Sequence, residues 1–303
     1  MLAKNAQIFR IVGATPEGLN EALAACQFVE CTPHAAQSSG FVFASPDYGT
    51  FTREAGNFTE FKLRTDKKIL PASVINEAAK HKAGEIEALQ GYKPGRKQMK
   101  EIKEGVTLEL LASAFVKTTV TRGWFDSAGW LIIDTPSAGR AEDVLDALRS
   151  ATDNPPIPFP VKMWRTERSP HACMTEWVAT QDPPDSLTID DSVKLVDHNG
   201  GKVSVSQRSA TSAEVIQLIT ESGATVSDLA MTMEDVASFI FTGQSLRRLS
   251  YLDVKDDPTG DPLTEEEQSA ADLILSGDAI RKVASCLTDA MGGMQEQINH
   301  HEE

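Results

Sequence analysis

The sequence has 303 residues, of which 41% are hydrophobic and 24% charged, and its formal net charge at pH 7 is -15. This composition is typical of a soluble globular protein with two or three lobes around a buried core. No stretch reaches the roughly eighteen apolar residues of a membrane-spanning helix, so we expect no membrane partner. The opening residues lack the pattern of a secretory signal, which predicts a cytoplasmic protein.

The cysteines are too few for a disulfide framework. There are four in the chain and none stands in a C-x-x-C pair, which favours a reducing compartment. Cys26, Cys31 and His34 lie close together, but no second pair of ligands follows at zinc-site spacing. We therefore expect buried thiols, with no metal and no cofactor.

Positive charge is concentrated in one region. Residues 62–122 contain 13 basic and 7 acidic residues, whereas the rest of the chain contains 16 basic and 37 acidic ones. An acidic body with one basic region is typical of a protein that meets a polyanion on one surface. A lysine-rich, solvated pair of helices explains the same counts equally well.

The first expected elements are a strand at residues 7–12 and a helix at residues 15–26, with Thr15 as its N-cap. A second strand at residues 58–65 alternates apolar with basic side chains. One face of that strand is therefore apolar and the other cationic.

Residues 68–115 predict two helices joined at a basic turn, because apolar residues recur at helical spacing on both sides of Pro94 and Gly95. Such a pair forms a projecting hairpin. Its inward-facing residues are predicted to be Ile75, Ala79, Ala83, Ile86 and Leu89 in the first helix, and Met99, Ile102, Val106 and Leu110 in the second.

The remaining elements alternate short strands with helices. We expect a β-hairpin at residues 114–135, a helix at 137–151, two strands around an Asn-Gly turn at 193–207, a helix at 211–222, an antiparallel meander at 224–253 and a closing pair of helices at 266–277 and 278–293. This mixture predicts an α+β fold with antiparallel sheets. The elongated, curved shape expected of the subunit follows only from the family resemblance described below.

The proline-rich segment at residues 154–160 is the expected boundary between lobes. The domain prediction is an N-terminal α+β lobe of residues 1–67 and 116–153, a basic helical tip of residues 68–115, and a C-terminal α+β lobe of residues 161–303.

Motifs for nucleotide binding, zinc-dependent hydrolysis and serine hydrolysis are absent. A metal-dependent nuclease is an alternative, because carboxylates can hold divalent metal ions. The candidate ligands are the pair Asp126 and Asp134, or an acidic cluster near the end of the chain. That cluster comprises Asp253, Asp256, Asp257, Asp261 and Glu265. A solvated loop and hairpin-end caps explain the same residues. Trp164 and Trp177 suit either base stacking or the core.

The chain resembles the RdgC family of bacterial recombination-associated proteins. The matching segments occur in the family's order: KILP at 68–71, AF at 114–115, GWLIIDTPSAGRAEDVLDALRS at 129–150, TEWV at 175–178, TSAEV at 211–215, SLRRLSY at 245–251, AADLILSGDAI at 270–280 and DAMGG at 289–293. The first 60 residues match least clearly.

The resemblance implies a non-enzymatic protein that binds double-stranded DNA without sequence preference, restrains RecA-type recombination and supports replication-fork processing. Single-stranded DNA is a further candidate ligand, and the recombinase a candidate partner. It also implies a ring-shaped homodimer around DNA, associated with the nucleoid. Lysines inside such a ring would neutralise phosphates.

The residues predicted to contact DNA are mainly lysines and arginines of the basic region. They are Lys62, Arg64, Lys80, Lys82, Lys93, Arg96, Lys97, Lys100, Lys103 and Lys117, with Gln207 and Arg208 added by the resemblance. The segment SQRS at residues 206–209 departs from the family's more lysine-rich pattern. Phe115 matches a family phenylalanine at the contact between two tips, and core packing is its alternative role.

Two other classes of function stay open. One is a metal-dependent nuclease that uses the acidic residues. The other is an acidic protein-interaction module that binds a recombination protein and has no need of the basic hairpin. Sequence alone leaves open how a ring would load onto DNA.

Overall fold

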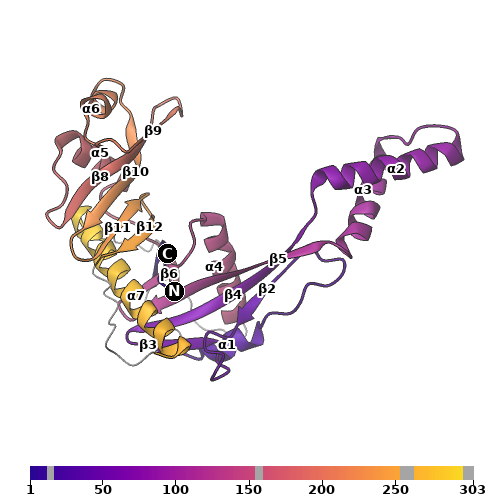
Figure 1. Ribbon diagram of the computed structural model, residues 1–303, viewed down its shortest axis with the longest axis horizontal. Coiled ribbons are helices and arrows are strands. Elements are labelled where there is room, and N and C mark those ends of the chain that lie inside the picture. Colours follow the sequence, from indigo (N-terminus) through magenta and orange to yellow (C-terminus); the bar gives the residue numbers. More distant parts are fainter. Residues whose placement is uncertain (12–16, 154–159, 253–262, 296–303) are drawn as a thin grey trace, which may run out of the picture.

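The computed structural model describes residues 1–11, 17–153, 160–252 and 263–295. Figure 1 shows an elongated, curved molecule with a helical hairpin at one end and a lobe of strands and short helices at the other. The N-terminus lies near the middle of the curve. The predicted α+β class is confirmed.

One large sheet of twelve strands runs through the molecule, and every pairing between its named strands is antiparallel. The order is β2 (Gln37–Val42), β4 (Phe58–Ile69), β5 (Phe115–Asp126), β6 (Trp130–Ile133), β1 (Asn5–Ile11), β12 (Ser245–Tyr251), β11 (Ala237–Phe241), β10 (Thr225–Met233), β8 (Leu187–Val196) and β9 (Lys202–Ser206). Off this path, β3 (Thr52–Ala55) pairs with β4 and β7 (Val161–Met163) pairs with β1.

The described residues contain seven helices. They are α1 (Leu19–Ala25), α2 (Ala72–Gln90), α3 (Arg96–Leu111), α4 (Ala138–Thr152), α5 (Pro170–Thr180), α6 (Ala213–Thr220) and α7 (Glu265–Ala290). The first helix is shorter than predicted and begins after Gly18, which adopts a left-handed conformation as its N-cap. Thr15, the predicted N-cap, lies outside the described residues.

Strand β1 joins the two halves of the sheet. On one side it pairs with β6, and on the other side its first residues pair with β12 while Phe9–Ile11 pair with β7. The strands of the N-terminal half and those of the C-terminal meander therefore belong to one hydrogen-bonded sheet. This pairing holds the lobes together along β1.

Alternate residues of a strand point to opposite faces of the sheet. In the N-terminal part of the sheet, both faces are apolar and each packs in a different core. On β6, Leu131 and Ile133 pack in the core that includes α1 and α4. Trp130 and Ile132 pack in a second core, which continues into the C-terminal lobe and includes α5 and α7. Trp164 and Trp177 belong to this second core, which confirms their core interpretation.

The closing pair of helices is a single helix, so that prediction is wrong. Helix α7 has 26 residues and begins with a capping box between Thr264 and Glu267. Gly277, where a break was expected, lies inside the helix and is buried against Phe58. A glycine within a helix is tolerated where the absence of a side chain allows a close contact.

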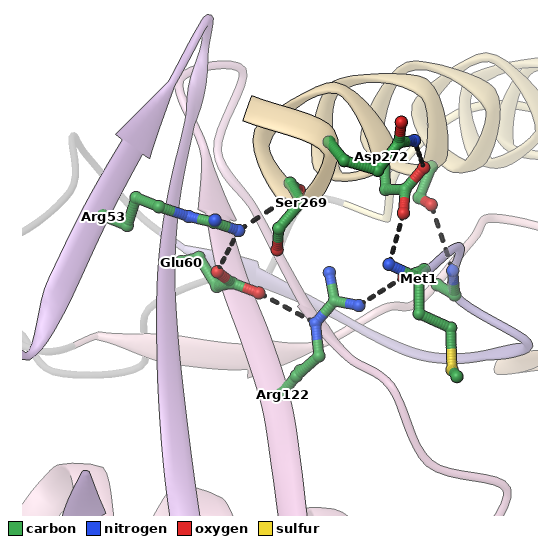
Figure 2. Close-up of polar contacts among 9 residues, drawn as sticks. Met1, Arg53, Glu60, Arg122, Ser269 and Asp272 are labelled. Atoms are coloured by element: carbon green, nitrogen blue, oxygen red, sulfur yellow. Dashed lines mark hydrogen bonds and ion pairs between the residues drawn. The ribbon is translucent and has the colours of Figure 1, made fainter. Parts of the chain in front are cut away.

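Buried charges connect α7 to the sheet (Figure 2). The fully buried carboxylate of Glu60 accepts hydrogen bonds from Arg53 Nη2 at 2.5 Å and Arg122 Nε at 2.8 Å. Arg53 also donates to the carbonyl oxygen of Ser269 on α7 at 3.2 Å. The network spans β3, β4, β5 and α7, and it holds the sheet and the helix in register.

Candidate nucleic-acid interface

The helical hairpin α2–α3 connects β4 to β5, which pair along their whole length from Phe58↔Asp126 to Ile69↔Phe115. The distal part of this ladder, residues 64–69 and 115–120, is called the arm. Figure 1 shows the arm extending from the N-terminal lobe with α2 and α3 at its end. The predicted projecting hairpin is confirmed.

A small apolar core holds α2 and α3 together. Ala79, Ile102 and Val106 are buried at its centre, with Ile86 and Met99 packed against them. Leu89, predicted to face inward, is 87% exposed, so this part of the prediction is wrong. Leu89 lies in the last turn of α2 and is not part of the small apolar core.

The predicted contact residues on the hairpin are all exposed. They are Lys80, Lys82, Lys93, Arg96, Lys97, Lys100 and Lys103. Within the described residues, the one ion pair that involves them joins Lys100 to Glu104 at 3.8 Å, with both side chains largely exposed. An ion pair between exposed side chains is weak, so it leaves Lys100 able to bind another anion. The hairpin thus presents cations that are available to an anionic partner.

Lys62 and Arg64 are engaged inside the protein. The Lys62 ammonium donates to the carbonyl oxygen of Ala44 at 2.9 Å, and burial lowers its pKa. Arg64 donates two hydrogen bonds to Asp66, at 2.9 and 2.8 Å, and its guanidinium lies 4.3 Å from the centre of the Phe28 ring. These hydrogen bonds raise the pKa of Arg64 and lower that of Asp66. The structure therefore gives both cations a role in the fold.

Lys117 lies on the arm and is exposed. It pairs across the ladder with Lys67, and both line a cleft with Arg140 of α4. Sequence analysis did not place Lys67 or Arg140 among the contact residues. The excess of positive charge pointed to Lys67, but only the fold brings Arg140 to the same place.

Gln207 and Arg208 follow β9 and are exposed. The backbone amide of Gln207 donates to the carbonyl oxygen of Asp191 at 3.0 Å, and Gln207 has a φ angle of 58°. Figure 1 shows β9 and the α2–α3 hairpin at opposite ends of the molecule. Within one chain, these two groups of predicted contact residues do not come together.

Phe115 is the first residue of β5 and is 85% exposed. Its cross-strand partner Ile69 is 51% exposed, and the neighbouring Val116 is 47% exposed. Core packing within the chain, the alternative role for Phe115, is therefore wrong. An aromatic side chain next to exposed aliphatic ones forms a small apolar patch where the arm meets the hairpin.

The carboxylates of Asp126 and Asp134 lie at opposite ends of the β5–β6 ladder. Asp126 pairs with Trp130, whereas the backbone amide of Asp134 donates to the carbonyl oxygen of Arg122, which lies about 13 Å from Asp126 along the strand. The suggestion that they meet is wrong. Asp126 contacts Arg281 at 3.5 Å, and burial raises the pKa of Asp134.

The other metal-binding suggestions find no support in the described part of the chain. There, no group of three or more histidine, cysteine, aspartate or glutamate residues is placed to hold a metal ion. The acidic residues Asp253, Asp256, Asp257 and Asp261 lie outside the described residues. No helix among the described residues is long and apolar enough to cross a membrane.

Comparison with known proteins decides the family. Residues 1–294 match the family model described as "Putative exonuclease, RdgC". The chain belongs to the RdgC family. The resemblance found in the sequence is confirmed, and it covers the first 60 residues as well.

Several relatives match over nearly their whole length. The recombination-associated protein RdgC of Herminiimonas arsenicoxydans is 35% identical over 303 residues, which cover 97% of this chain and 99% of that protein. The protein of the same description from Cupriavidus pinatubonensis is 36% identical over 301 residues, with coverage of 97% and 99%. That of Bordetella pertussis is 34% identical over 305 residues, again with 97% and 99%.

Proposed function

We propose that this protein binds double-stranded DNA without sequence preference, as a homodimeric ring, and thereby restrains RecA-type recombination. The observation that carries the proposal is the set of exposed cations on α2 and α3, of which only Lys100 has an ion-pair partner in the described chain. The chain as a whole has a formal charge of -15. Cations of this kind bind phosphates, while an acidic body repels DNA elsewhere.

The curved shape supports a dimer rather than a monomer as the binding unit. The hairpin lies at the opposite end of one subunit from β9, the strand that Gln207 and Arg208 directly follow (Figure 1). Two subunits that pair tip to tip and lobe to lobe would place both groups of residues around one central hole. The exposed apolar patch of Phe115, Ile69 and Val116 suits a contact between tips, since burial of apolar side chains stabilises association.

A role in recombination is supported by the names of the relatives, which are described as recombination-associated proteins. A ring on duplex DNA would limit the access of recombinase filaments and support replication-fork processing. This function places the protein in the cytoplasm, associated with the nucleoid. Single-stranded DNA is a secondary ligand to test, because it carries the same phosphates.

The experiment is fluorescence anisotropy of a short labelled duplex titrated with the protein over a salt series. We expect affinity to fall steeply with salt, with a slope of log K against log salt of about -0.9 for each neutralised phosphate. Two duplexes of unrelated sequence should bind alike. Absence of binding at low salt would contradict the proposal. A labelled single strand measures the preference between the two forms of DNA.

A second candidate function is a nuclease, which the description of the family model supports. The same samples test it when they contain magnesium and the DNA is sized on a denaturing gel afterwards. Shortened DNA, lost when magnesium is chelated, would favour the nuclease. Intact DNA at every salt concentration favours binding without cleavage.

A third candidate is an interaction module whose acidic surface binds a basic site on a recombination protein. Its support is the excess of acidic residues outside the region 62–122. In this case the protein would bind purified recombinase in the absence of DNA. Neutral substitutions at Lys97 and Lys100 would leave that binding unchanged, whereas they weaken binding to DNA under the leading proposal.

A further inference from the structure

A cleft of about 370 Å³ lies where the arm leaves the N-terminal lobe. Its floor is formed by β2, β4 and β5, and its wall is the first turn of α4. Three basic side chains line it, Lys67, Lys117 and Arg140, together with one carboxylate, Asp143. The cleft is therefore cationic, in contrast to the chain as a whole.

Two of these cations stand directly opposite each other. Lys67 of β4 and Lys117 of β5 are cross-strand partners in the ladder, so their side chains lie on the same face. Neither has an ion-pair partner within the described residues. Like charges at such positions destabilise a sheet. An anion bound between them would remove this repulsion.

The first turn of α4 adds hydrogen-bond donors. The Ser137 hydroxyl accepts a hydrogen bond from the backbone amide of Arg140 at 3.3 Å. The backbone amides of Ala138 and Gly139 have no partner in the described structure. Free amides at the start of a helix of 15 residues attract anions through the helix dipole. Gly139 itself lines the cleft.

An unpaired hydroxyl group on a largely buried residue gives an independent indication of a ligand. Thr121 of β5 is only 5% exposed and lines the cleft. Its hydroxyl has no hydrogen-bond partner in the described part of the chain. A threonine hydroxyl can donate and accept hydrogen bonds, so it is available to a ligand in the cleft. The Thr119 hydroxyl lies on the same face two residues away and is also without a partner there.

We propose that this cleft binds one phosphodiester group of the nucleic-acid backbone at the base of the arm. The inference rests on the proposed function and extends the DNA contact from the hairpin to the lobe. The charged groups of Lys67, Lys117 and Arg140 surround the phosphate, and the Gly139 amide and the Thr121 hydroxyl donate hydrogen bonds to its oxygens. Asp143 opposes binding.

The first test compares duplex binding by the wild type with that of the double variant Lys117→Ala, Arg140→Ala across a salt series. Loss of one phosphate contact should make the slope shallower by about 0.9, which weakens binding roughly eightfold near 0.1 M salt. Lys282→Ala, which removes an exposed lysine of α7, is the matched control and should change nothing. Asp143→Asn should tighten binding. A double variant that behaves like Lys282→Ala overturns the proposal.

The second test follows backbone amide resonances of Gly139 and Thr121 by NMR, first with duplex DNA and then with inorganic phosphate. Shifts with duplex in the wild type, lost in Arg140→Ala, support the site. Unmoved resonances while the duplex binds overturn the site and leave the proposed function standing. If the wild type binds no duplex, both the cleft site and the proposed function fail. Shifts with inorganic phosphate alone would then assign the cleft to a free phosphate.

Discussion

Gly277 of α7 faces Phe58 of β4 so closely that a Cβ atom at Gly277 would lie 2.5 Å from the ring Cζ atom. Both residues are buried in the core that joins the lobes. The helix therefore needs a glycine at this position in order to approach the sheet, although glycine costs a helix interior about 1 kcal/mol relative to alanine.

Opposite effects are expected from glycine to alanine substitutions in two helices. Gly277→Ala should destabilise the protein by about 1–3 kcal/mol, because the buried ring has to move. Gly105→Ala in α3 should stabilise it by about 0.5–1 kcal/mol, because a Cβ atom there meets nothing within 4 Å. Thermal and urea unfolding measure both. Equal effects of the two substitutions would contradict the close packing.

Glu60 neutralises the buried Arg53 and the half-buried Arg122, so Glu60→Gln should be strongly destabilising. The change leaves Arg53 and Arg122 without their anionic partner and should cost about 3–5 kcal/mol. Urea unfolding measures the loss, with Glu54→Gln on the exposed side of β3 as the control. Replacement of all three charged residues by apolar ones should recover much of the stability. A neutral outcome for Glu60→Gln would mean that the network is not coupled to stability.

Tyr251 should make stability fall at high pH. Its hydroxyl donates to the carbonyl oxygen of Ala3 at 2.8 Å, and burial raises its pKa to about 12 from the usual tyrosine value of 10.0. Between these two values the folded state holds a proton that the unfolded state has released. Stability therefore decreases as pH rises through this window, and the contribution is complete below it.

Absorbance titration of the phenolate checks this directly, because the chain has only three tyrosines. Tyr48 and Tyr92 are 79% and 64% exposed. Tyr251→Phe should remove the late step of the titration, and it should flatten the pH dependence of stability above pH 10. A single common step for all three tyrosines would contradict the buried hydrogen bond.

The hairpin cations should govern the salt dependence of DNA binding. Lys97→Ala combined with Lys100→Ala should reduce the slope of log K against log salt by about 0.9 for each lysine that contacts a phosphate. Both side chains are exposed, so the unfolding free energy should change little. Lys62→Ala is a contrasting variant, because its ammonium bonds Ala44 within the protein. It should lower stability and leave the slope unchanged.

Phe115 should control self-association. Phe115→Ala removes the largest side chain of the apolar patch, and its 85% exposure means that the fold should tolerate the change. If the tips of two subunits meet there, the dissociation constant of the dimer should rise about tenfold or more, since truncation of an aromatic contact residue commonly costs above 1 kcal/mol. Analytical ultracentrifugation measures it. Tyr48→Ala, which also truncates an exposed aromatic residue, should leave the dimer unchanged.

Local pattern was sufficient to predict several elements of the fold. Apolar residues at helical spacing around Pro94 and Gly95 predicted α2 and α3, and the Asn199–Gly200 turn predicted the β8–β9 hairpin. These elements depend on contacts between residues near in sequence, where periodicity and turn chemistry act. The concentration of lysines on the hairpin was likewise visible as a count of charges.

Tertiary structure alone decided which cations remain available. Lys62 and Arg64 have the same pattern as exposed basic residues, yet each meets an internal oxygen acceptor, Ala44 and Asp66. Likewise, the joint between β1 and β12 and the meeting of Lys67, Lys117 and Arg140 bring together residues far apart in the chain. Such contacts depend on strand order and on how far a helix extends over a sheet, which no local periodicity contains. The sequence by itself determined several of the elements and the charge of each region, and long-range pairing decided where that charge is exposed.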